Sequence, residues 1–408
     1  MPTVSRRQAF RLWLKLGLLS FGGPAGQIAL LHHELVVQRG WVSSGDFSRG
    51  LNLCMLLPGP EALQLVIYLG WRLHGTAGGL VAGLCFVLPA CLLMACLAFA
   101  YVTWGQLPGV LAALAGLKSA VLALIMYSVV RLARTSLQGR VAWMLAGSAC
   151  LAMILEGGAF PWILATAAAI GWILLPADVI DAHLPSNSFS WFRAGRILLV
   201  GLMLWGLPWL LLPAAGRGGG LPADAYWLFT QAALISFGGA YAVIAWVQHQ
   251  AVEVLGWISL DDAMIALGMA EATPGPLVTA LQFIGFLAGW NAPGDDGPLA
   301  TAIGVALLAG YATFLPSFVL ILAGAAGIDW LSGQARLQGA LAGVTAAAVG
   351  VMASLGWQFG ASLAAASPTA MLIVIPAGLL LASGRIGAPT VILGGLASGV
   401  LLHAAGLA

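Results

Sequence analysis

Apolar residues run through this chain in long uninterrupted stretches, and charged residues are confined to short segments between them. No Asp, Glu, Lys or Arg occurs in residues 75–117, 141–155, 197–216, 337–384 or 386–408. A bilayer core about 30 Å thick is crossed by a helix of roughly 20 apolar residues. Several of these stretches can hold one such helix, and the longest can hold two. The pattern therefore predicts a helical protein that crosses a membrane several times.

The composition agrees with this pattern. Of the 408 residues, 61% are hydrophobic and 7% are charged, and the mean hydropathy is +0.98. A soluble domain carries about 25% charged residues. The net charge of only +2 gives no support for nucleic-acid binding. The five cysteines lie in apolar stretches without C-x-x-C spacing, which indicates small core residues rather than a redox or metal site.

The N-terminal segment is basic and amphipathic. Arg6, Arg7, Arg11 and Lys15 alternate with apolar residues, and no short apolar core with a small-residue cleavage site follows them. This favours an uncleaved first helix that enters the membrane from the cytoplasm over a removed signal peptide.

An internal repeat organises the chain. The repeated motifs are Ser20-Phe21-Gly22-Gly23 with Ser236-Phe237-Gly238-Gly239, Gly40-Trp41 with Gly256-Trp257, and Pro58-Gly59-Pro60 with Pro274-Gly275-Pro276. Each pair is 216 residues apart, the difference between positions 236 and 20, 257 and 41, or 274 and 58. After an insertion at 291–298, typical of a surface loop, the offset becomes 227 and pairs Pro89 with Pro316 and Gly116 with Gly343.

The repeat predicts three segments: a first transmembrane repeat (1–176), a linker with one additional helix (177–224) and a second repeat (225–408). Two helical segments flank each Pro-Gly-Pro, at 46–74 and 262–290. Long apolar spans follow at 76–104, 108–134, 142–156 and 160–175 in the first copy, and at 299–325, 337–357, 368–383 and 389–407 in the second. The additional span is expected at 197–212.

The additional span bears on orientation. If each copy crosses the membrane an even number of times, one extra crossing inverts the second copy. The charges agree: Arg131, Arg134 and Arg140 fill a loop whose counterpart at 358–368 has no charge, and positive residues favour the cytoplasm. We therefore expect an all-α polytopic membrane protein whose two homologous halves are inverted-topology repeats with broken or re-entrant helices. Whether the Pro-Gly-Pro segments re-enter or span is left open.

The repeated motifs interrupt otherwise apolar helices. Gly-Gly lets the backbone leave helical geometry, and Pro24 and the Pro-Gly-Pro prolines cannot continue a helix. One such break alone is typical of close helix packing. Four breaks in register are typical of a secondary-transporter site, where irregular backbone lines a cavity and helix N-termini point at an anion.

Polar residues near the breaks extend this candidate site. Gln27, Gln64, Thr273, Thr279 and Gln282 could donate hydrogen bonds to oxyanion oxygens. Lys15, Arg49 and Arg72 could be cations near the first-copy breaks or could extend to the membrane interface. Lys118 is the only charged residue within 75–130, which makes it a functional candidate. The predicted substrate-binding residues are Ser20, Phe21, Gly22, Gly23, Pro24, Gln27, Pro58, Gly59, Pro60, Gln64, Lys118, Ser236, Gly238, Gly239, Thr273, Pro274, Gly275, Pro276 and Gln282.

Two acids adjoin the Pro-Gly-Pro motifs. Glu61 follows the first motif, and Glu271 precedes the second by three residues. Either could simply satisfy a helix dipole, or one of them could take up a proton as the anion leaves. His32, His33 and His249 are expected at the interface rather than at a metal. The sequence has no phosphate-binding loop, no zinc pattern and no nucleophile–base pair, so we expect neither an enzyme nor a cofactor.

The motifs resemble a known family. Ser-Phe-Gly-Gly-Pro-Ala-Gly-Gln-Ile-Ala (20–29), Leu-Leu-Pro-Gly-Pro-Glu-Ala (56–62), Phe-Gly-Gly-Ala-Tyr (237–241) and Ala-Glu-Ala-Thr-Pro-Gly-Pro-Leu (270–277) are similar to those of the chromate ion transporter family, the ChrA-type proteins, in its long two-domain form. The resemblance implies a multi-pass carrier of the bacterial inner membrane that expels chromate, drawing on the proton gradient. Ala240 stands where Pro24 would be repeated, so the two half-sites are unequal.

The resulting prediction is a proton-coupled exporter of chromate, with the lipid bilayer and a chromate- or sulfate-like dianion as its partners. Uptake or exchange of sulfate or a related oxyanion is an alternative, because both anions are tetrahedral and doubly charged. A non-transporting membrane scaffold or sensor is an alternative of another class. The sequence does not fix the oligomeric state, and a homodimer is kept open.

Overall fold

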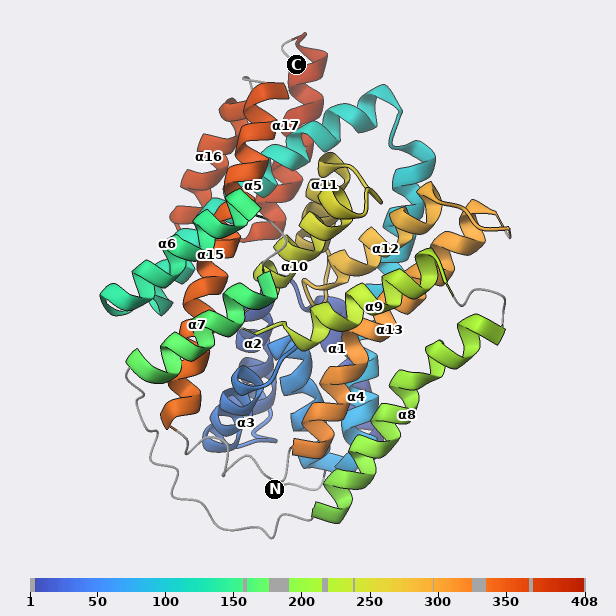
Figure 1. Cartoon of the computed structure of the whole chain (residues 1–408), viewed down its shortest axis with the longest axis vertical. Helices are drawn as coiled ribbons and strands as arrows, with labels where there is room; N and C mark the ends of the chain where they lie inside the picture. Colours follow the sequence, from blue (N-terminus) through green and yellow to red (C-terminus); the bar gives the residue numbers. More distant parts are fainter. Residues whose placement is uncertain are drawn as a thin grey trace.

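The protein is built from helices alone in the part of the chain that the structure describes. That structure is a computed structural model, and it describes residues 4–156, 160–175, 191–214, 219–237, 239–295, 297–324, 335–366 and 370–406. These residues form sixteen α-helices and two short π-helical segments, with no strand among them (Figure 1). The predicted all-α fold is confirmed.

Each repeat begins with a broken helix and a hairpin. In the first repeat these elements are α1 (Arg6–Leu19), α2 (Gly23–His32), η1 (His33–Gln38), α3 (Ser44–Leu56) and the long α4 (Glu61–Trp104). In the second they are α9 (Leu221–Leu234), α10 (Ala240–His249), η2 (Gln250–Val254), α11 (Leu260–Ala272), α12 (Thr279–Asn291) and α13 (Pro298–Gly324). The first hairpin, α2–η1–α3, lies in the lower half of Figure 1, and α11 of the second lies in the upper half.

The tips of the two hairpins have the same local structure. The Trp41 N–H donates to the Leu35 carbonyl over 2.9 Å, and the Trp257 N–H donates to the Ala251 carbonyl over 2.7 Å. Gly40 and Gly256 precede these tryptophans with φ of 59° and 62°, a left-handed conformation that glycine adopts without steric cost. The turn that reverses each hairpin therefore depends on its Gly-Trp dipeptide.

Serine side chains start the helix after each turn. Ser43 caps α3 by accepting from the Asp46 N–H at 3.1 Å, and Ser259 caps α11 by accepting from the Asp262 N–H at 3.1 Å. Both are N-caps of the Ser-x-x-acid type, which satisfy backbone donors that the first helical turn leaves open. Residues related by the offset of 216 therefore make equivalent hydrogen bonds in the two repeats.

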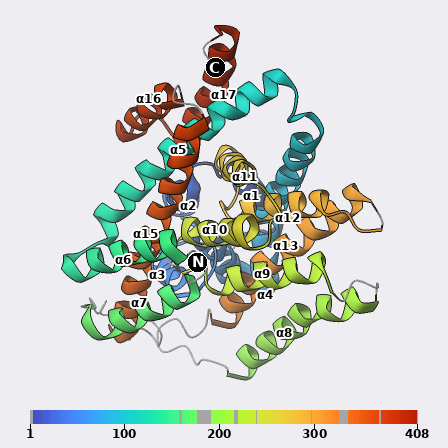
Figure 2. The same cartoon turned by 45° about the horizontal axis from the view of Figure 1, so that its top comes forward.

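Most of the remaining helices pack against helices of the other repeat. They are α5 (Pro108–Ser136), α6 (Gly139–Glu156) and α7 (Phe160–Leu174) in the first repeat, α15 (Ala335–Ala366), α16 (Met371–Ala382) and α17 (Ala388–Ala404) in the second, and α8 (Trp191–Ala214) between them. Helix α5 packs against α16 and α17, whereas α15 packs against α6 and α7. The two repeats therefore share one core rather than folding as separate domains (Figures 1 and 2).

Glycines allow these helices to approach closely. A Cβ at Gly116 of α5 would overlap the backbone of Gly395 on α17, and a Cβ at Gly343 of α15 would overlap the backbone of Ala167 on α7. Gly116 and Gly343 are the pair expected from the 227-residue offset. The two repeats are therefore similar in their helix packing as well as in their motifs. Small residues serve this purpose in membrane bundles because they let backbones meet.

Five of the described helices are long and apolar enough to cross a membrane: Glu61–Trp104, Pro108–Ser136, Trp191–Leu212, Pro298–Gly324 and Arg336–Ala366. The expected boundary between 46–74 and 76–104 lies within α4, at a kink where Gly75 has φ of 66°. Helix α15 extends beyond the predicted 337–357 because its Ala-rich sequence contains no proline up to residue 366. The additional span of the linker is part of α8, which packs on α9 and α13 and leaves most of its apolar side chains exposed, as a lipid-facing helix does.

Candidate substrate site at the crossed helix breaks

The four helix breaks meet in two pairs, and each pair contains one break from each repeat. The Gly59 N–H of the first Pro-Gly-Pro donates to the Ser236 carbonyl of the second repeat over 2.9 Å. The Gly275 N–H of the second Pro-Gly-Pro donates to the Ser20 carbonyl of the first repeat over 3.1 Å. These equivalent bonds cross the repeat interface, so the breaks lie close together in the fold although they are far apart in sequence.

Glycine is required at the centre of each Pro-Gly-Pro. Gly59 and Gly275 have φ of 130° and 115°, where L-residues are strained. A Cβ at Gly59 would overlap the Ser317 hydroxyl oxygen of α13, and a Cβ at Gly275 would overlap the Ala90 Cβ of α4. Neither break has room for a side chain.

The glutamines next to the breaks bind backbone carbonyls. The Gln27 Nε2 donates to the Gly275 carbonyl over 2.5 Å and to the Ser20 carbonyl over 3.2 Å. The Gln64 Nε2 donates to the Pro58 carbonyl over 2.7 Å, and the Gln282 Nε2 donates to the Cys91 carbonyl over 3.2 Å. The Gln27 and Gln64 amides that we expected to donate to an oxyanion therefore hold the irregular backbone of the breaks in this conformation, and the Gln282 amide binds α4.

The threonines behave in the same way. The Thr279 hydroxyl donates to the Pro276 carbonyl at 2.9 Å, and the Thr273 hydroxyl donates to the Ala270 carbonyl at 3.3 Å. Both residues are buried. Their hydroxyls stabilise the ends of the helices on either side of the second Pro-Gly-Pro.

Other buried polar atoms at this place have no hydrogen-bond partner among the described residues. They are the hydroxyl oxygens of Ser20, Thr313 and Ser317 and the amide oxygens of Gln64 and Gln282. Buried polar groups in native proteins are nearly always satisfied, and exceptions mark a site for water, an ion or a ligand. The crossed breaks thus contain polar surface that the protein itself does not use.

Sequence reasoning missed Thr313 and Ser317, although a signal was present. With the 227-residue offset, their counterparts in α4 are Phe86 and Ala90, since 313 − 227 is 86 and 317 − 227 is 90. A comparison of the two repeats position by position would have marked two hydroxyls on α13 where the first repeat is apolar. Without that comparison, single Ser and Thr residues in a membrane helix do not indicate a binding site.

Helices begin at the breaks, as expected. Helix α2 begins at Gly23 after Gly22, whose φ is 91°, and Pro24 takes its second position. Helix α10 begins at Ala240 after Gly239, whose φ is 120°. Helix α4 begins directly after Pro60, whereas α12 begins three residues after Pro276. Helix starts carry backbone N–H groups without intrahelical partners and a positive dipole end. Gly238 lies outside the described residues.

The two acids occupy different surroundings. Glu271 is buried near the end of α11, and its carboxylate accepts a hydrogen bond from the Tyr241 hydroxyl of α10. Ser128 and Arg131 of α5 lie near that hydroxyl. Glu61 is the first residue of α4 and is partly exposed. Of these two acids, Glu271 is therefore the enclosed one.

Lys118 does not lie beside the breaks. Its Nζ is 2.9 Å from the Asp261 carboxylate at the start of α11. The second Pro-Gly-Pro follows the other end of α11, about 18 Å away at 1.5 Å per residue. Lys118 instead connects α5 of the first repeat to the tip of the second hairpin.

The other candidate cations lie near the tip of the first hairpin. Arg49 and Arg72 contact the Asp46 carboxylate at 2.6 and 2.9 Å, and Lys15 contacts Glu34 at 2.5 Å. Burial opposes ionisation of Asp46, but hydrogen bonds from Ser43 and Arg49 outweigh it and lower the pKa of this carboxyl below its usual value. Asp46 is therefore charged at neutral pH, and the two arginines give this tip a net positive charge.

The tip of the second hairpin has the opposite charge. Glu253, Asp261 and Asp262 lie there with Lys118 as the nearby cation, and Asp262 accepts from the Tyr101 hydroxyl rather than from an arginine. Equivalent ends of the two repeats thus carry opposite charge. This is the distribution expected when they face opposite sides of a membrane and the basic side is cytoplasmic.

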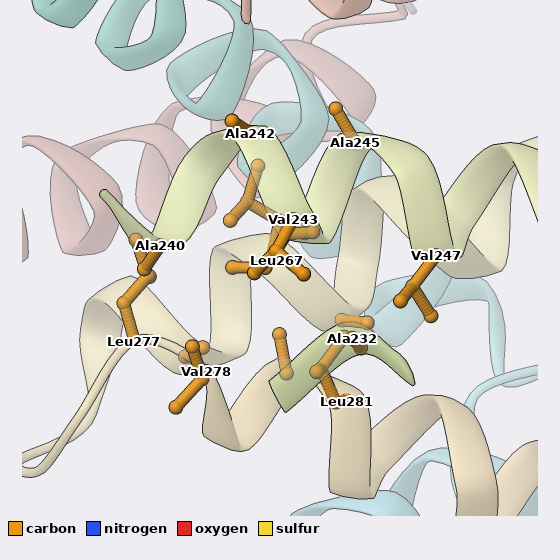
Figure 3. Packing of buried hydrophobic residues seen from close by; sticks show 14 of the residues in the cluster. Ala232, Ala240, Ala242, Val243, Ala245, Val247, Leu267, Leu277, Val278 and Leu281 are labelled. Carbon is orange, nitrogen blue, oxygen red and sulfur yellow. The ribbon is translucent and has the colours of Figure 1, made fainter. Parts of the chain in front are cut away.

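The hairpins also differ in burial. Helix α10 packs against α9, α12 and α15, and Figure 3 shows its alanines and valines above Leu267 of α11 and Leu281 of α12. Helix α2 packs mainly on α4, and Phe21 at its break is 42% exposed. Phe237 at the second break is only partly exposed, so the first break is the more open of the two.

The fold and the crossed breaks define a multi-pass α-helical membrane protein made of two inverted, interlocked repeats, an architecture of secondary transporters. The sequence model of the chromate transporter family matches residues 7–172 and 223–400. The chain belongs to the chromate transporter family.

Relatives in three bacteria match most of the chain. It is 34% identical over 355 residues to the chromate transport protein of Pseudomonas aeruginosa, covering 86% of this chain and 80% of that protein. It is 28% identical over 410 residues to the chromate transport protein of Cupriavidus metallidurans, covering 98% and 95%. It is 30% identical over 357 residues to a probable chromate transport protein of Synechococcus elongatus, covering 86% and 84%. No solved structure matches this chain.

Proposed function

We propose that this protein is a secondary carrier that exports chromate across the bacterial inner membrane and is driven by the proton gradient. The observation that carries the proposal is the crossing of the four breaks, in which each Pro-Gly-Pro glycine is bonded to the serine carbonyl of the other repeat. A substrate bound at this crossing contacts residues of both repeats. Family membership supports chromate as the anion.

The dianion binds at the helix starts beside the crossing. Helices α2 and α10 begin at Ser-Phe-Gly-Gly breaks, where free N–H groups and the positive dipole end favour an anion. The Ser20 hydroxyl is buried and unpartnered within the described chain, and it can donate there. In contrast, the Gly59 and Gly275 N–H groups are already bonded, so these glycines shape the site rather than bind the anion.

The two hairpins are packed differently against the rest of the protein, and this difference supports an alternating-access mechanism. The second hairpin is packed against helices of both repeats, while the first is supported mainly by α4. In an inverted-repeat carrier, the opposite state exchanges the conformations of the two repeats. The present conformation is then open toward the tip of the first hairpin, and its counterpart is open toward the tip of the second.

The charges of the tips support export. Arg49 and Arg72 surround Asp46 at the open, basic side, whereas Asp261 and Asp262 lie at the enclosed side. A basic vestibule concentrates a dianion, and an acidic one disperses it. Chromate therefore enters from the basic, cytoplasmic side and leaves past the acidic side.

Glu271 is the proposed proton acceptor. It is buried beside the second Pro-Gly-Pro and is held by Tyr241, so its carboxylate can exchange a proton with the site but not with bulk solvent in this state. Protonation of Glu271 as the dianion leaves would couple the two fluxes. Glu61, which is partly exposed beside the first Pro-Gly-Pro, is the candidate proton acceptor on the open side.

Sulfate transport is the second candidate. Backbone N–H groups and hydroxyls recognise a tetrahedral dianion by charge and shape, and sulfate shares both with chromate. A scaffold without transport would leave the buried hydroxyls at the crossing without a role. Competition by sulfate and stabilisation of the purified protein by chromate but not by chloride separate these alternatives.

The test measures uptake of labelled chromate by everted membrane vesicles with and without a proton gradient. Gly59→Ala, Pro60→Ala and Gly22→Leu should abolish uptake while the protein remains inserted. Gly45→Ala, at an exposed glycine of the first hairpin with open space around it, is the matched control and should transport normally. Normal uptake by the three break variants would contradict the site, and uptake that ignores the gradient would contradict the coupling.

A further inference from the structure

Helix α13 presents two buried hydroxyls that its own backbone does not use. Thr313 and Ser317 are one turn apart and therefore lie on the same face, with exposed fractions of 3% and 0%. Ser and Thr inside a helix usually donate to a carbonyl one turn earlier, as Ser119 and Ser354 do here. The hydroxyls of Thr313 and Ser317 have no partner within the described chain.

Ser317 lies against the first Pro-Gly-Pro. A Cβ built on Gly59 would overlap the Ser317 Oγ and would lie 2.7 Å from the Gln64 Nε2. The Gly59 N–H points elsewhere, to the Ser236 carbonyl at 2.9 Å. The second repeat thus supplies both the carbonyl that holds this break and the free hydroxyl beside it.

The equivalent position in the other half has no hydroxyl. Gly275 of the second Pro-Gly-Pro faces Ala90 of α4, and Ala90 is the counterpart of Ser317 under the 227-residue offset. The geometry of glycine against helix is the same at both breaks, so the hydroxyl is not needed to form the break. Its presence at one break alone points to a ligand rather than to packing.

We propose that the Ser317 hydroxyl is a ligand of the transported tetrahedral oxyanion at the first Pro-Gly-Pro break, with the Thr313 hydroxyl as a second donor one turn away. This inference rests on the proposed function and deepens it. A hydroxyl can turn its hydrogen toward an anionic oxygen, and hydrogen bonds to a charged acceptor are stronger than those between neutral groups. Residues one turn apart have Cβ atoms about 5–6 Å apart, a spacing that allows two oxygens of one dianion to be bound.

The competing explanation is a structural water between Ser317 and the free Gln64 amide oxygen. Such a water would affect stability but not the concentration dependence of transport. The two explanations therefore differ in KM, which is the quantity to measure.

The experiment compares Ser317→Ala and Ser317→Thr with Ser354→Ala in everted vesicles that take up labelled chromate. Ser354 is a matched control because it is a buried serine whose hydroxyl is bonded within its own helix. We expect Ser317→Ala to raise KM for chromate about tenfold or more, the loss typical of a hydrogen bond to a charged group. Ser317→Thr keeps the hydroxyl and should stay much closer to the wild type, and Ser354→Ala should leave KM unchanged.

A KM of Ser317→Ala within about twofold of the wild type would overturn the inference, because a truncated ligand must weaken binding. If this variant does not insert, Ser317→Cys, which keeps the volume but is a weak donor, is measured in its place and judged by the same criterion. Absence of uptake by the wild type would instead refute the proposed function. The two failures are therefore distinct.

Discussion

The two hairpins have the same turns and caps but not the same surroundings. At equivalent positions, Ala29 of α2 is exposed and Ala245 of α10 is 4% exposed. Helix α11 packs against α5 and α17, whereas α3 packs mainly on α4. Since both hairpins keep their internal hydrogen bonds, the difference lies in how each hairpin sits against the rest of the molecule.

This difference shows how a duplicated sequence can produce two unequal half-sites. Divergence has placed Glu271 and Tyr241 in the second hairpin, where the first has Met55 and Ala25. It has also placed Ser317 beside the first Pro-Gly-Pro, whereas Ala90 lies at the equivalent position beside the second Pro-Gly-Pro. The second Pro-Gly-Pro thus has a buried acid, Glu271, near it, and the first Pro-Gly-Pro has the unpartnered Ser317 hydroxyl beside it. This arrangement suits a carrier that binds its anion and its proton at separate groups.

The largest expected effect tests the crossing itself. We expect Gly59→Ala and Gly275→Ala both to abolish transport, and Gly275→Ala to be the less stable. Both strain a residue with positive φ, at about 1–3 kcal/mol. The added methyl meets movable side-chain ends at Gly59 but the Ala90 Cβ of a packed helix at Gly275, which adds about 1–3 kcal/mol of overpacking. Thermal unfolding in detergent measures the difference.

Ala90→Gly provides the control for this comparison. In the Gly275→Ala background it removes the obstructing methyl, so part of the lost stability should return. Equal unfolding temperatures for the two alanine variants, or no recovery with Ala90→Gly, would show that the two breaks are not held as the structure has them.

The next effect concerns Glu271, the buried acid beside the second Pro-Gly-Pro. Glu271→Gln should remove the stimulation of chromate uptake by a proton gradient while leaving exchange of chromate across the membrane, because the amide cannot carry the proton. Tyr241→Phe should weaken the stimulation less, since the carboxyl remains. Tyr226→Phe, in which a fully buried tyrosine loses its hydrogen bond to the Trp205 carbonyl, controls for the loss of a hydrogen bond from a buried tyrosine. Full stimulation in Glu271→Gln would exclude this residue from coupling.

A smaller effect reports the openness of the hairpins directly. In a cysteine-free background, Ala29→Cys should react with a water-soluble maleimide at least about tenfold faster than Ala245→Cys, because labelling of the buried site requires local opening. A proton gradient with chromate should narrow the difference by populating the opposite state. An unreactive Ala29→Cys would mean that α2 faces lipid rather than a water-filled opening.

The sequence was sufficient to predict the helical fold, the two copies and the positions of the breaks. These features depend on local chemistry: apolar length, Gly and Pro at helix ends, and a fixed offset. From the offset, Gly59 and Gly275 can be recognised as equivalent. The offset does not predict that each glycine is bonded to the serine of the other copy. That exchange is a property of packing between distant segments, so it became visible only in three dimensions.

Side-chain roles were harder to predict for the same reason. Gln27 and Gln64 have amides that can donate to an anion or to a carbonyl, and in the structure both donate to carbonyls of the breaks. Lys118 stood out because its surroundings in sequence are uncharged, yet its partner Asp261 lies 143 residues away. The boundaries of the three sequence segments stay a prediction.

The smallest expected effect separates the site from the charges at its periphery. Lys118→Met breaks the ion pair with Asp261, whose side chain is 56% exposed, and exposed pairs contribute about 0–1 kcal/mol. Because this pair is about 18 Å along α11 from the second Pro-Gly-Pro, KM for chromate should change less than about twofold, an effect below 1 kcal/mol. Asp261→Asn should match it, and the double variant should be no worse than either single one. A large rise in KM for Lys118→Met alone, with Asp261→Asn unchanged, would return Lys118 to the substrate site. It would mean that the anion binds at the tip of the second hairpin rather than at the crossed breaks.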